Sequence, residues 1–323
     1  MAATLALALL TFTLGVTFGP RWLRFLQAHQ MGKQLNPSEP EEHAHKEGTP
    51  TMGGVVFMAP IFAVGLTFQV LFGGQLMALL PLTLAAGCAL LGAIDDLQTL
   101  VSKARSEGLS PRAKWAVEIV LSLASGGALA WAGYNTIHIP FAGALTVPPW
   151  LYVPAATFLL LCTINGVGIT DGMDSLVGTT AGIAFSAFWI IAWHAGEPIS
   201  ATLCGITVGG LLAYLWFNAH PAQMFMGDTG SLALGSLLGM VALMERQPLL
   251  LLPIGVIYVA NVLSDILQVL SVRLRGKRLF HIAPMHHHFR RMGWPETWVV
   301  QRFWITGAVG AVIGLLLAFA GGS

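Results

Sequence analysis

The sequence predicts an all-α polytopic membrane protein with about ten transmembrane helices. Its 323 residues are 55% hydrophobic and only 10% charged, with a mean hydropathy of +0.72. Soluble domains carry about 25% charged residues. A run of about 20 apolar residues can cross a bilayer. The apolar runs between polar breaks are 3–25, 52–73, 76–96, 114–133, 149–164, 176–195, 199–218, 229–245, 248–272 and 298–320, and they predict a single integral membrane domain over 1–323.

The first run and the segment between the fourth and fifth runs have separate interpretations. The first run leads directly into Arg21 and Arg24 without a small-residue cleavage site, so we expect a retained helix rather than a signal peptide. Segment 134–149 alternates weakly between apolar and polar residues, with Gly and Pro breaks. It predicts a short extracellular hairpin or loop. The three cysteines lie inside apolar runs, which favours buried thiols over disulfides or metal ligands.

Basic residues predict the orientation of the chain. Of the 16 Lys and Arg residues, all except Arg246 fall on one side when the runs cross the membrane alternately. Loops rich in Lys and Arg lie in the cytoplasm. The basic loops are therefore expected in the cytoplasm and both termini outside. The net charge of +1 hides this asymmetry and gives no indication of nucleic acid binding.

Acidic residues gather at the cytoplasmic ends of the runs, which is unusual because a charge near hydrocarbon is costly and usually marks a site. Asp95 and Asp96 lie at the end of the third run, after LAAGCALLGAI. Two adjacent carboxylates repel each other unless a cation or a Lys compensates them. Mg²⁺ prefers oxygen ligands and is the expected cation. The alternative is a solvated helix end, although acidic residues there oppose the helix dipole.

Two further motifs lie on the same predicted face. In the turn 165–174, glycines allow backbone N–H groups to approach phosphates, and Asn165, Asp171 and Asp174 could bind metal or a base. In segment 218–231, Asp228 lies at a helix start suited to pyrophosphate and Mg²⁺, and Phe225 could stack on a base. The alternative for both motifs is helix capping, by Asp174 in the first and by Asp228, Thr229 or Ser231 in the second.

Two basic motifs could contact an anionic substrate. His286, His287 and His288 are consecutive, so their side chains do not converge on one zinc ion, and we expect them to bind substrate. Lys46 precedes segment 47–54 and is a candidate phosphate contact. A structural role for both segments is the alternative.

Five segments together resemble the phospho-N-acetylmuramoyl-pentapeptide transferase (MraY) family: GTPTMGG at 48–54, IDD at 94–96, NGVGITDGMD at 165–174, NAHPAQMFMGDTGSLALG at 218–235 and APMHHHF at 283–289. The resemblance implies an enzyme that forms lipid I and UMP from UDP-MurNAc-pentapeptide and undecaprenyl phosphate, with Mg²⁺. It implies catalytic roles for Asp95, Asp96 and Asp228, with Asp228 as the metal ligand. It implies substrate contacts for Lys46, Asn165, Asp171, Asp174, Phe225 and the three histidines.

The chain departs from the family pattern at five positions in four motifs. Thr99 replaces a Lys, Gly168 an Asn, Ser175 a Gly, and Arg290 a Glu. In the ninth run, Asn261 stands where the family has Glu, and Asp265 follows one helical turn later on the same face. Direct attack by the lipid phosphate and a covalent aspartyl-phosphate route both fit the acidic residues.

Two other functions remain open. A related enzyme that transfers GlcNAc-1-phosphate to a polyprenyl phosphate would share the acidic motifs, but the triple His and MFMGDTGS favour the muramoyl-peptide branch. A transporter or scaffold would explain the ten runs, but not the Asp clusters at one face. Gly-rich helix faces are compatible with a homodimer.

Overall fold

The computed structural model describes residues 1–32, 48–73, 76–101 and 108–320, and confirms the all-α class. Nine described helices are long and apolar enough to cross a membrane. They are α1 (Ala2–Ala28), α3 (Leu80–Val101), α4 (Pro111–Trp131), α5 (Pro149–Thr170), α6 (Leu176–His194), α7 (Pro198–Asn218), α8 (Gly227–Met244), α10 (Val256–Arg275) and α12 (Glu296–Ala320). The second predicted run contains a shorter apolar helix, α2 (Val55–Phe68), followed by η2 (Gln69–Gly73) and η3 (Leu76–Leu79).

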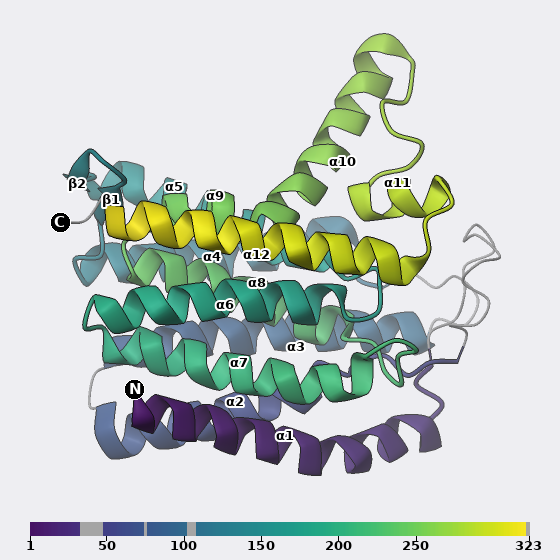
Figure 1. Cartoon of the computed structure of the whole chain (residues 1–323), viewed down its shortest axis with the longest axis horizontal. Helices are drawn as coiled ribbons and strands as arrows, with labels where there is room; N and C mark the ends of the chain where they lie inside the picture. Colours follow the sequence, from purple (N-terminus) through teal and green to yellow (C-terminus); the bar gives the residue numbers. More distant parts are fainter. Residues whose placement is uncertain (33–47, 74–75, 102–107, 321–323) are drawn as a thin grey trace.

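The ninth predicted run is wrong as a single helix. It contains η4 (Pro248–Leu250) and α9 (Leu251–Ile254), and α10 begins only after Gly255. Pro248 and Pro253 lack a backbone N–H donor, and Gly255 has little helix propensity, so the run breaks there. Figure 1 shows α10 leaving the bundle at a steep angle, with α11 (Met285–Arg291) beside its base.

Local sequence explains several helix ends. Proline occupies the first helical position in α4, α5 and α7, where its missing N–H costs nothing. The Ser110 hydroxyl accepts a hydrogen bond from the Ala113 N–H and caps α4. Gly276 ends α10 with φ of +64°, the left-handed conformation typical of a helix C-terminus.

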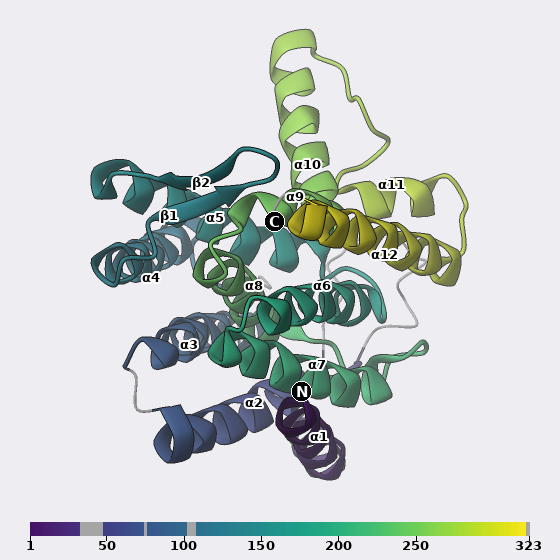
Figure 2. The ribbon, with the colours of Figure 1, turned by 60° about the vertical axis from the view of Figure 1, so that its left-hand side comes forward.

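Helix α8 forms the centre of the bundle. It packs against α3, α5, α6 and α7 (Figure 2), and 89% of its most apolar window is buried. The corresponding value is 22% for α1 and α10, which lie at the periphery. Side chains at the start of α8 are therefore surrounded by the ends of neighbouring helices.

The two ends of the bundle differ. The start of α1 and the end of α12 lie at one end (Figure 1), together with an antiparallel hairpin of β1 (Thr136–Ile139) and β2 (Gly143–Thr146). The expected hairpin in segment 134–149 is thus confirmed. At the opposite end α3 and α5 finish and α4 and α8 begin, so the Asp-bearing motifs of distant segments meet there.

Candidate active site

Asp96 links the end of α3 to the start of α8. Its Oδ1 accepts a hydrogen bond from the Asp228 N–H at 3.1 Å. Its Oδ2 accepts from the Thr229 N–H at 3.0 Å and from the Thr229 hydroxyl at 2.6 Å. Amides in the first helical turn have no partner within their own helix. Asp96 therefore caps α8 from another helix, and the capping role considered for Asp228 is filled by Asp96.

Glycine allows this close approach. Gly227 has φ of +71°, and a Cβ atom there would lie 2.5 Å from Asp96 Oδ2. Across the same interface, a Cβ on Gly92 would lie 2.1 Å from the Asp228 carbonyl oxygen. Any larger residue at either position would push α3 away from α8, so the glycines set the distance between the acidic residues.

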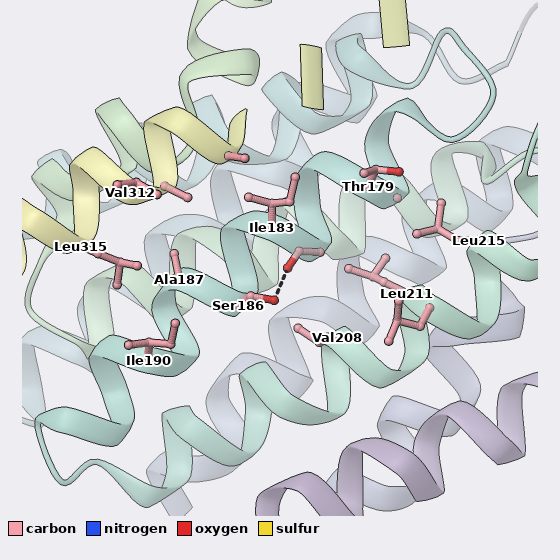
Figure 3. Close-up of a pocket in the computed structure, with 15 residues that line it drawn as sticks. Thr179, Ile183, Ser186, Ala187, Ile190, Val208, Leu211, Leu215, Val312 and Leu315 are labelled. Carbon is pink, nitrogen blue, oxygen red and sulfur yellow. Dashed lines mark hydrogen bonds between the residues drawn. The ribbon is translucent and has the colours of Figure 1, made fainter. Parts of the chain in front are cut away.

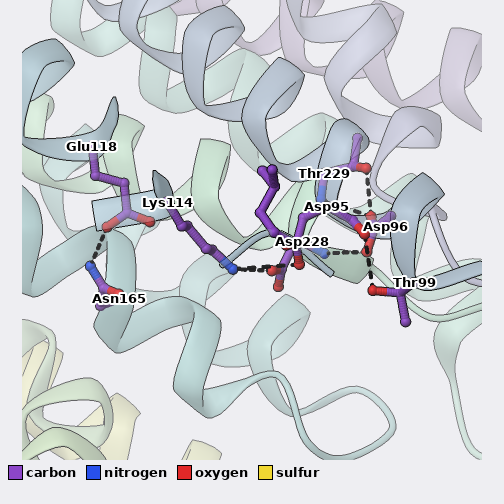
Figure 4. A network of polar contacts seen from close by, with 9 residues as sticks. Asp95, Asp96, Thr99, Lys114, Glu118, Asn165, Asp228 and Thr229 are labelled. Carbon is purple, nitrogen blue, oxygen red and sulfur yellow. Dashed lines mark hydrogen bonds and ion pairs between the residues drawn. The ribbon is translucent and has the colours of Figure 1, made fainter. Parts of the chain in front are cut away.

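Lys114 supplies the positive charge of this site (Figure 4). Its Nζ pairs with Asp228 Oδ2 and lies 3.8 Å from Asp95 Oδ2. Asp95 Oδ1 accepts a hydrogen bond from the Leu109 N–H at 2.7 Å, just before α4. Among the described residues, the ion pairs of these carboxylates involve Lys114 alone. Asp95 and Asp228 thus face one ammonium group, which leaves an excess of negative charge.

Lys114 was not among the site residues predicted from the sequence. The helix start at Ser110–Pro111 was the signal that could have placed Lys114 at the same end as Asp95 and Asp96. The structure also accounts for Thr99, whose hydroxyl donates to the Asp95 carbonyl oxygen at 2.9 Å. Thr99 carries no charge, and Lys114 is the cation beside the acidic pair.

Asn165 joins the same network from α5. Its Nδ2 donates to Glu118 Oε2 at 2.7 Å and to the Leu161 carbonyl oxygen at 3.0 Å. Glu118 lies one helical turn after Lys114 on α4 and is completely buried. Glu118 was not predicted as a site residue, because a single Glu within an apolar run has no spacing that connects it to Asn165.

Asp174 anchors a second group of polar residues. Its buried Oδ2 accepts hydrogen bonds from His220 Nδ1 at 2.8 Å and from the Ala222 N–H at 3.2 Å. Its own N–H donates to Glu296 Oε1 at 2.9 Å. These bonds tie the turn that contains Asp171 and Asp174 to the loop between α7 and α8 and to the first turn of α12.

Ser175 follows in a strained conformation. Its φ of +65° lies in the left-handed region, where glycine is favoured. The Ser175 N–H donates to Asn218 Oδ1 at 2.8 Å, and its hydroxyl donates to the Asn218 carbonyl oxygen at 3.1 Å. These two bonds offset the strain at the position where the family pattern has Gly.

Two clusters of residues offer ligand atoms for a metal ion. Within the described residues, Asp174, His220 and Glu296 form the one set of three whose ligand atoms lie within 4.8 Å of one another. Asp95, Asp96 and Asp228 do not meet this spacing, although they offer oxygen atoms only. Mg²⁺ prefers oxygen, whereas an imidazole suits zinc and other transition metals. The acidic cluster fits Mg²⁺ better by ligand type, and the second group has the closer spacing.

The side chains of the three consecutive histidines lie in different surroundings. His286 is fully buried, with Nδ1 at 3.3 Å from Asn261 Oδ1. A Cβ on Gly172 would lie 2.4 Å from His286 Nε2 and 3.1 Å from His287 Nε2, so both rings pack on this turn. The His288 ring stacks on His281 with centroids 5.2 Å apart. A common zinc site is therefore not formed.

His286 predicts a pH-dependent stability. Burial, and then the neighbouring His287, lower the pKa of His286 well below its usual value. The unfolded chain binds this proton more readily than the folded chain, so the stabilisation is complete above about pH 6.5 and is lost as pH falls below it. We expect the melting temperature of wild type to fall from pH 7 to pH 5 more steeply than that of His286→Gln. The exposed His138→Gln is the control, and equal slopes in wild type and His286→Gln would contradict this assignment.

Phe225 and Lys46 were both predicted to contact the substrate, and Phe225 pairs with the segment before α2. The Phe225 N–H donates to the Pro50 carbonyl oxygen at 2.8 Å, and the Phe225 carbonyl oxygen accepts from the Gly53 N–H at 2.7 Å. Residues 48–54 therefore pair with the loop between α7 and α8. Lys46 lies outside the described residues.

An apolar pocket of about 400 Å³ lies between α6, α7 and α12 (Figure 3). Its lining includes Ile183, Leu211 and Val312, and it contains none of the predicted site residues. The polar network at the helix ends is thus the candidate site.

Comparisons with known proteins show which family the chain resembles. The sequence profile of glycosyl transferase family 4 matches residues 78–245, which include the acidic cluster. Residues 46–58 match phospho-N-acetylmuramoyl-pentapeptide-transferase signature 1.

Curated relatives carry the same name, phospho-N-acetylmuramoyl-pentapeptide-transferase. The relative from Chloroflexus aurantiacus is 38% identical, over 98% of this chain and 90% of its own. The relative from Geobacillus thermodenitrificans is 37% identical over 95% of both chains. The relative from Bacillus licheniformis is 38% identical over 95% of both chains.

Proposed function

The chain belongs to the phospho-N-acetylmuramoyl-pentapeptide-transferase family, and from this membership we propose how its polar network acts. The reaction moves phospho-MurNAc-pentapeptide from its UDP carrier to undecaprenyl phosphate and yields lipid I and UMP for peptidoglycan synthesis. The observation that carries the assignment of the site is the meeting of Asp95, Asp228 and Lys114 from three helices at one end of the bundle.

This end of the bundle faces the cytoplasm in our proposal. Within the described residues, Lys and Arg near it outnumber those at the end with the hairpin, where Arg246 lies. Basic loops remain cytoplasmic. In a bacterial inner membrane the site then meets the soluble UDP-linked donor and the phosphate of the lipid acceptor at the same surface.

Asp228 is proposed to hold Mg²⁺ through its carboxylate oxygens. When bound, Mg²⁺ neutralises pyrophosphate charge and stabilises the departing UMP. In the described structure one Asp228 oxygen pairs with Lys114, so a divalent cation would compete with the ammonium group for it.

The two adjacent aspartates are proposed to have different roles. Both oxygens of Asp96 are engaged by the first turn of α8, so Asp96 positions Asp228. Asp95 is then the member of the pair that accepts a proton from the lipid phosphate or orients it for attack. Lys114 lies beside both reactive carboxylates and would stabilise the negative charge of the transferred phosphoryl group.

The donor substrate is proposed to lie over the turn 171–174 and the loop between α7 and α8. Phe225 would stack on the base and Lys46 would contact phosphate. Asp171, Asp174, His287 and His288 would bind the nucleotide sugar. His286 is buried beneath the turn and would act by supporting it.

Lys114 offers a direct test of the charge balance. Lys114→Met should lower transfer about 100-fold, because removing one partner of a partly buried ion pair leaves unpaired carboxylates. Thr99→Lys should restore part of the activity in that background and add little to wild type. Arg112→Met, an exposed change in the same helix turn, is the control. If Lys114→Met is well folded and as active as this control, Lys114 is not part of the site.

A transfer assay tests the proposed reaction. Radiolabelled UDP-MurNAc-pentapeptide and UDP-GlcNAc are each incubated with purified protein and undecaprenyl phosphate, and the lipid product is counted. We expect transfer from the first donor only. Transfer from UDP-GlcNAc alone would instead assign the chain to the related GlcNAc-1-phosphate reaction.

A further inference from the structure

Glu118 is a buried carboxylate that the proposed reaction does not yet use. Its side chain is completely buried, and one oxygen, Oε1, has no hydrogen-bond partner in the part of the chain that the structure describes. An unsatisfied buried polar group costs about 1–3 kcal/mol, more when it is charged. A methionine of similar length would avoid this cost, so stability does not explain a Glu at this position.

The hydrogen bond that Glu118 accepts from the Asn165 amide indicates its role (Figure 4). Both hydrogen-bonding directions of Asn165 Nδ2 are occupied, one by Glu118 Oε2 at 2.7 Å and the other by the Leu161 carbonyl oxygen at 3.0 Å. An amide NH₂ group has two donors. The opposite amide orientation would place an oxygen against these two oxygens, so the partners fix which way the amide points.

One polar atom of Asn165 remains for a ligand. Its Oδ1 makes no hydrogen bond within the described residues, and the side chain is half-buried. A carbonyl oxygen only accepts hydrogen bonds. The ionised oxygens of a phosphate also only accept, so they would repel it. The nucleotide sugar does have hydrogen-bond donors, namely the uracil N–H, the sugar hydroxyls and the acetamido N–H.

We propose that Glu118 is a positioning residue that holds Asn165 as an acceptor for a hydrogen-bond donor of the nucleotide sugar. This inference rests on the proposed function, since it takes the donor substrate from it. Glu118 acts from α4 on a residue of α5 and does not itself touch substrate. Lys114 lies one turn earlier on α4, so one helix sets both the cation of the acidic cluster and the orientation of Asn165.

Four variants test the inference: Glu118→Met, Glu118→Gln, Asn165→Asp and the double variant Glu118→Gln/Asn165→Asp. Glu118→Met frees the amide to rotate, so KM for UDP-MurNAc-pentapeptide should rise about tenfold or more, with a smaller change in kcat. Glu118→Gln can still accept from Nδ2, so its KM should stay within about threefold of wild type. Asn165→Asp places a second carboxylate against that of Glu118, so kcat/KM should fall at least about tenfold.

The double variant provides the sharpest control. The introduced glutamine can donate to the introduced aspartate, so the pair regains a hydrogen bond with donor and acceptor exchanged, and part of the loss should be recovered. Recovery is partial because the Leu161 carbonyl oxygen still faces an oxygen. A double variant no better than Asn165→Asp alone would contradict the proposed pairing.

Thermal stability separates positioning from a structural role. Replacing a buried charge by an apolar residue of similar size is often neutral or stabilising. Glu118→Met should therefore melt no lower than wild type while its KM rises. A large loss of melting temperature in both Glu118 variants, with KM unchanged, would overturn the proposal. A change confined to the half-activating Mg²⁺ concentration would also overturn it, because Oδ1 would then serve the cation.

Calorimetric titration with UDP-MurNAc-pentapeptide in Mg²⁺ and without lipid acceptor keeps this test independent of turnover. Weaker binding by Glu118→Met than by Glu118→Gln supports the inference, and equal binding overturns it. Wild-type protein that binds this nucleotide but does not transfer its sugar would refute the proposed reaction and leave the binding comparison intact.

Discussion

EDTA should abolish transfer by the purified wild-type protein, and excess Mg²⁺ should restore it. Asp95 and Asp228 lie beside a single ammonium group, and a pyrophosphate brought to them adds further negative charge. Like charges about 4 Å apart repel strongly where water is partly excluded. The assay measures labelled lipid product over a range of free Mg²⁺ concentrations. Undiminished turnover in chelator would remove the metal from the mechanism.

Asp228→Asn should lower turnover at least about 100-fold, equivalent to about 2.7 kcal/mol of transition-state stabilisation. The substitution keeps the shape of the side chain and removes its charge. Because Asp96 caps the first turn of α8, the helix start should persist, and the melting temperature should change little.

Glu197→Gln is the matched control for Asp228→Asn. It removes one negative charge from an exposed position at the other end of the bundle. We expect wild-type turnover from it. A folded Asp228→Asn protein that turns over as fast as Glu197→Gln would show that the Asp228 charge is dispensable.

Composition and spacing predicted the membrane class, the hairpin and the end of the bundle where the acidic motifs meet. These features follow from local signals: apolar length, turn residues and alternating crossings. The break before α10 was the exception. A continuous run of apolar residues conceals it, although Pro253 and Gly255 carry the information.

The partners within the site could not be predicted from the sequence. Asp96 caps a helix that begins more than a hundred residues later, and Lys114 reaches Asp228 across a similar separation. Such contacts depend on how α3, α4 and α8 pack, not on local spacing. His286 shows the same limit, because its burial against Gly172 follows from the docking of α11 on a distant turn.

Pulsed electron paramagnetic resonance with Mn²⁺ in place of Mg²⁺ tests the central claim most directly. The measurement uses wild type and Asp228→Asn with UDP-MurNAc-pentapeptide and no lipid acceptor, so that no turnover occurs. We predict one bound Mn²⁺ coupled to phosphorus of the diphosphate in wild type, and loss of that signal in Asp228→Asn. Retention of the signal in the variant, or nitrogen coupling that disappears in His220→Ala, would contradict the account and place the metal at the Asp174, His220 and Glu296 group.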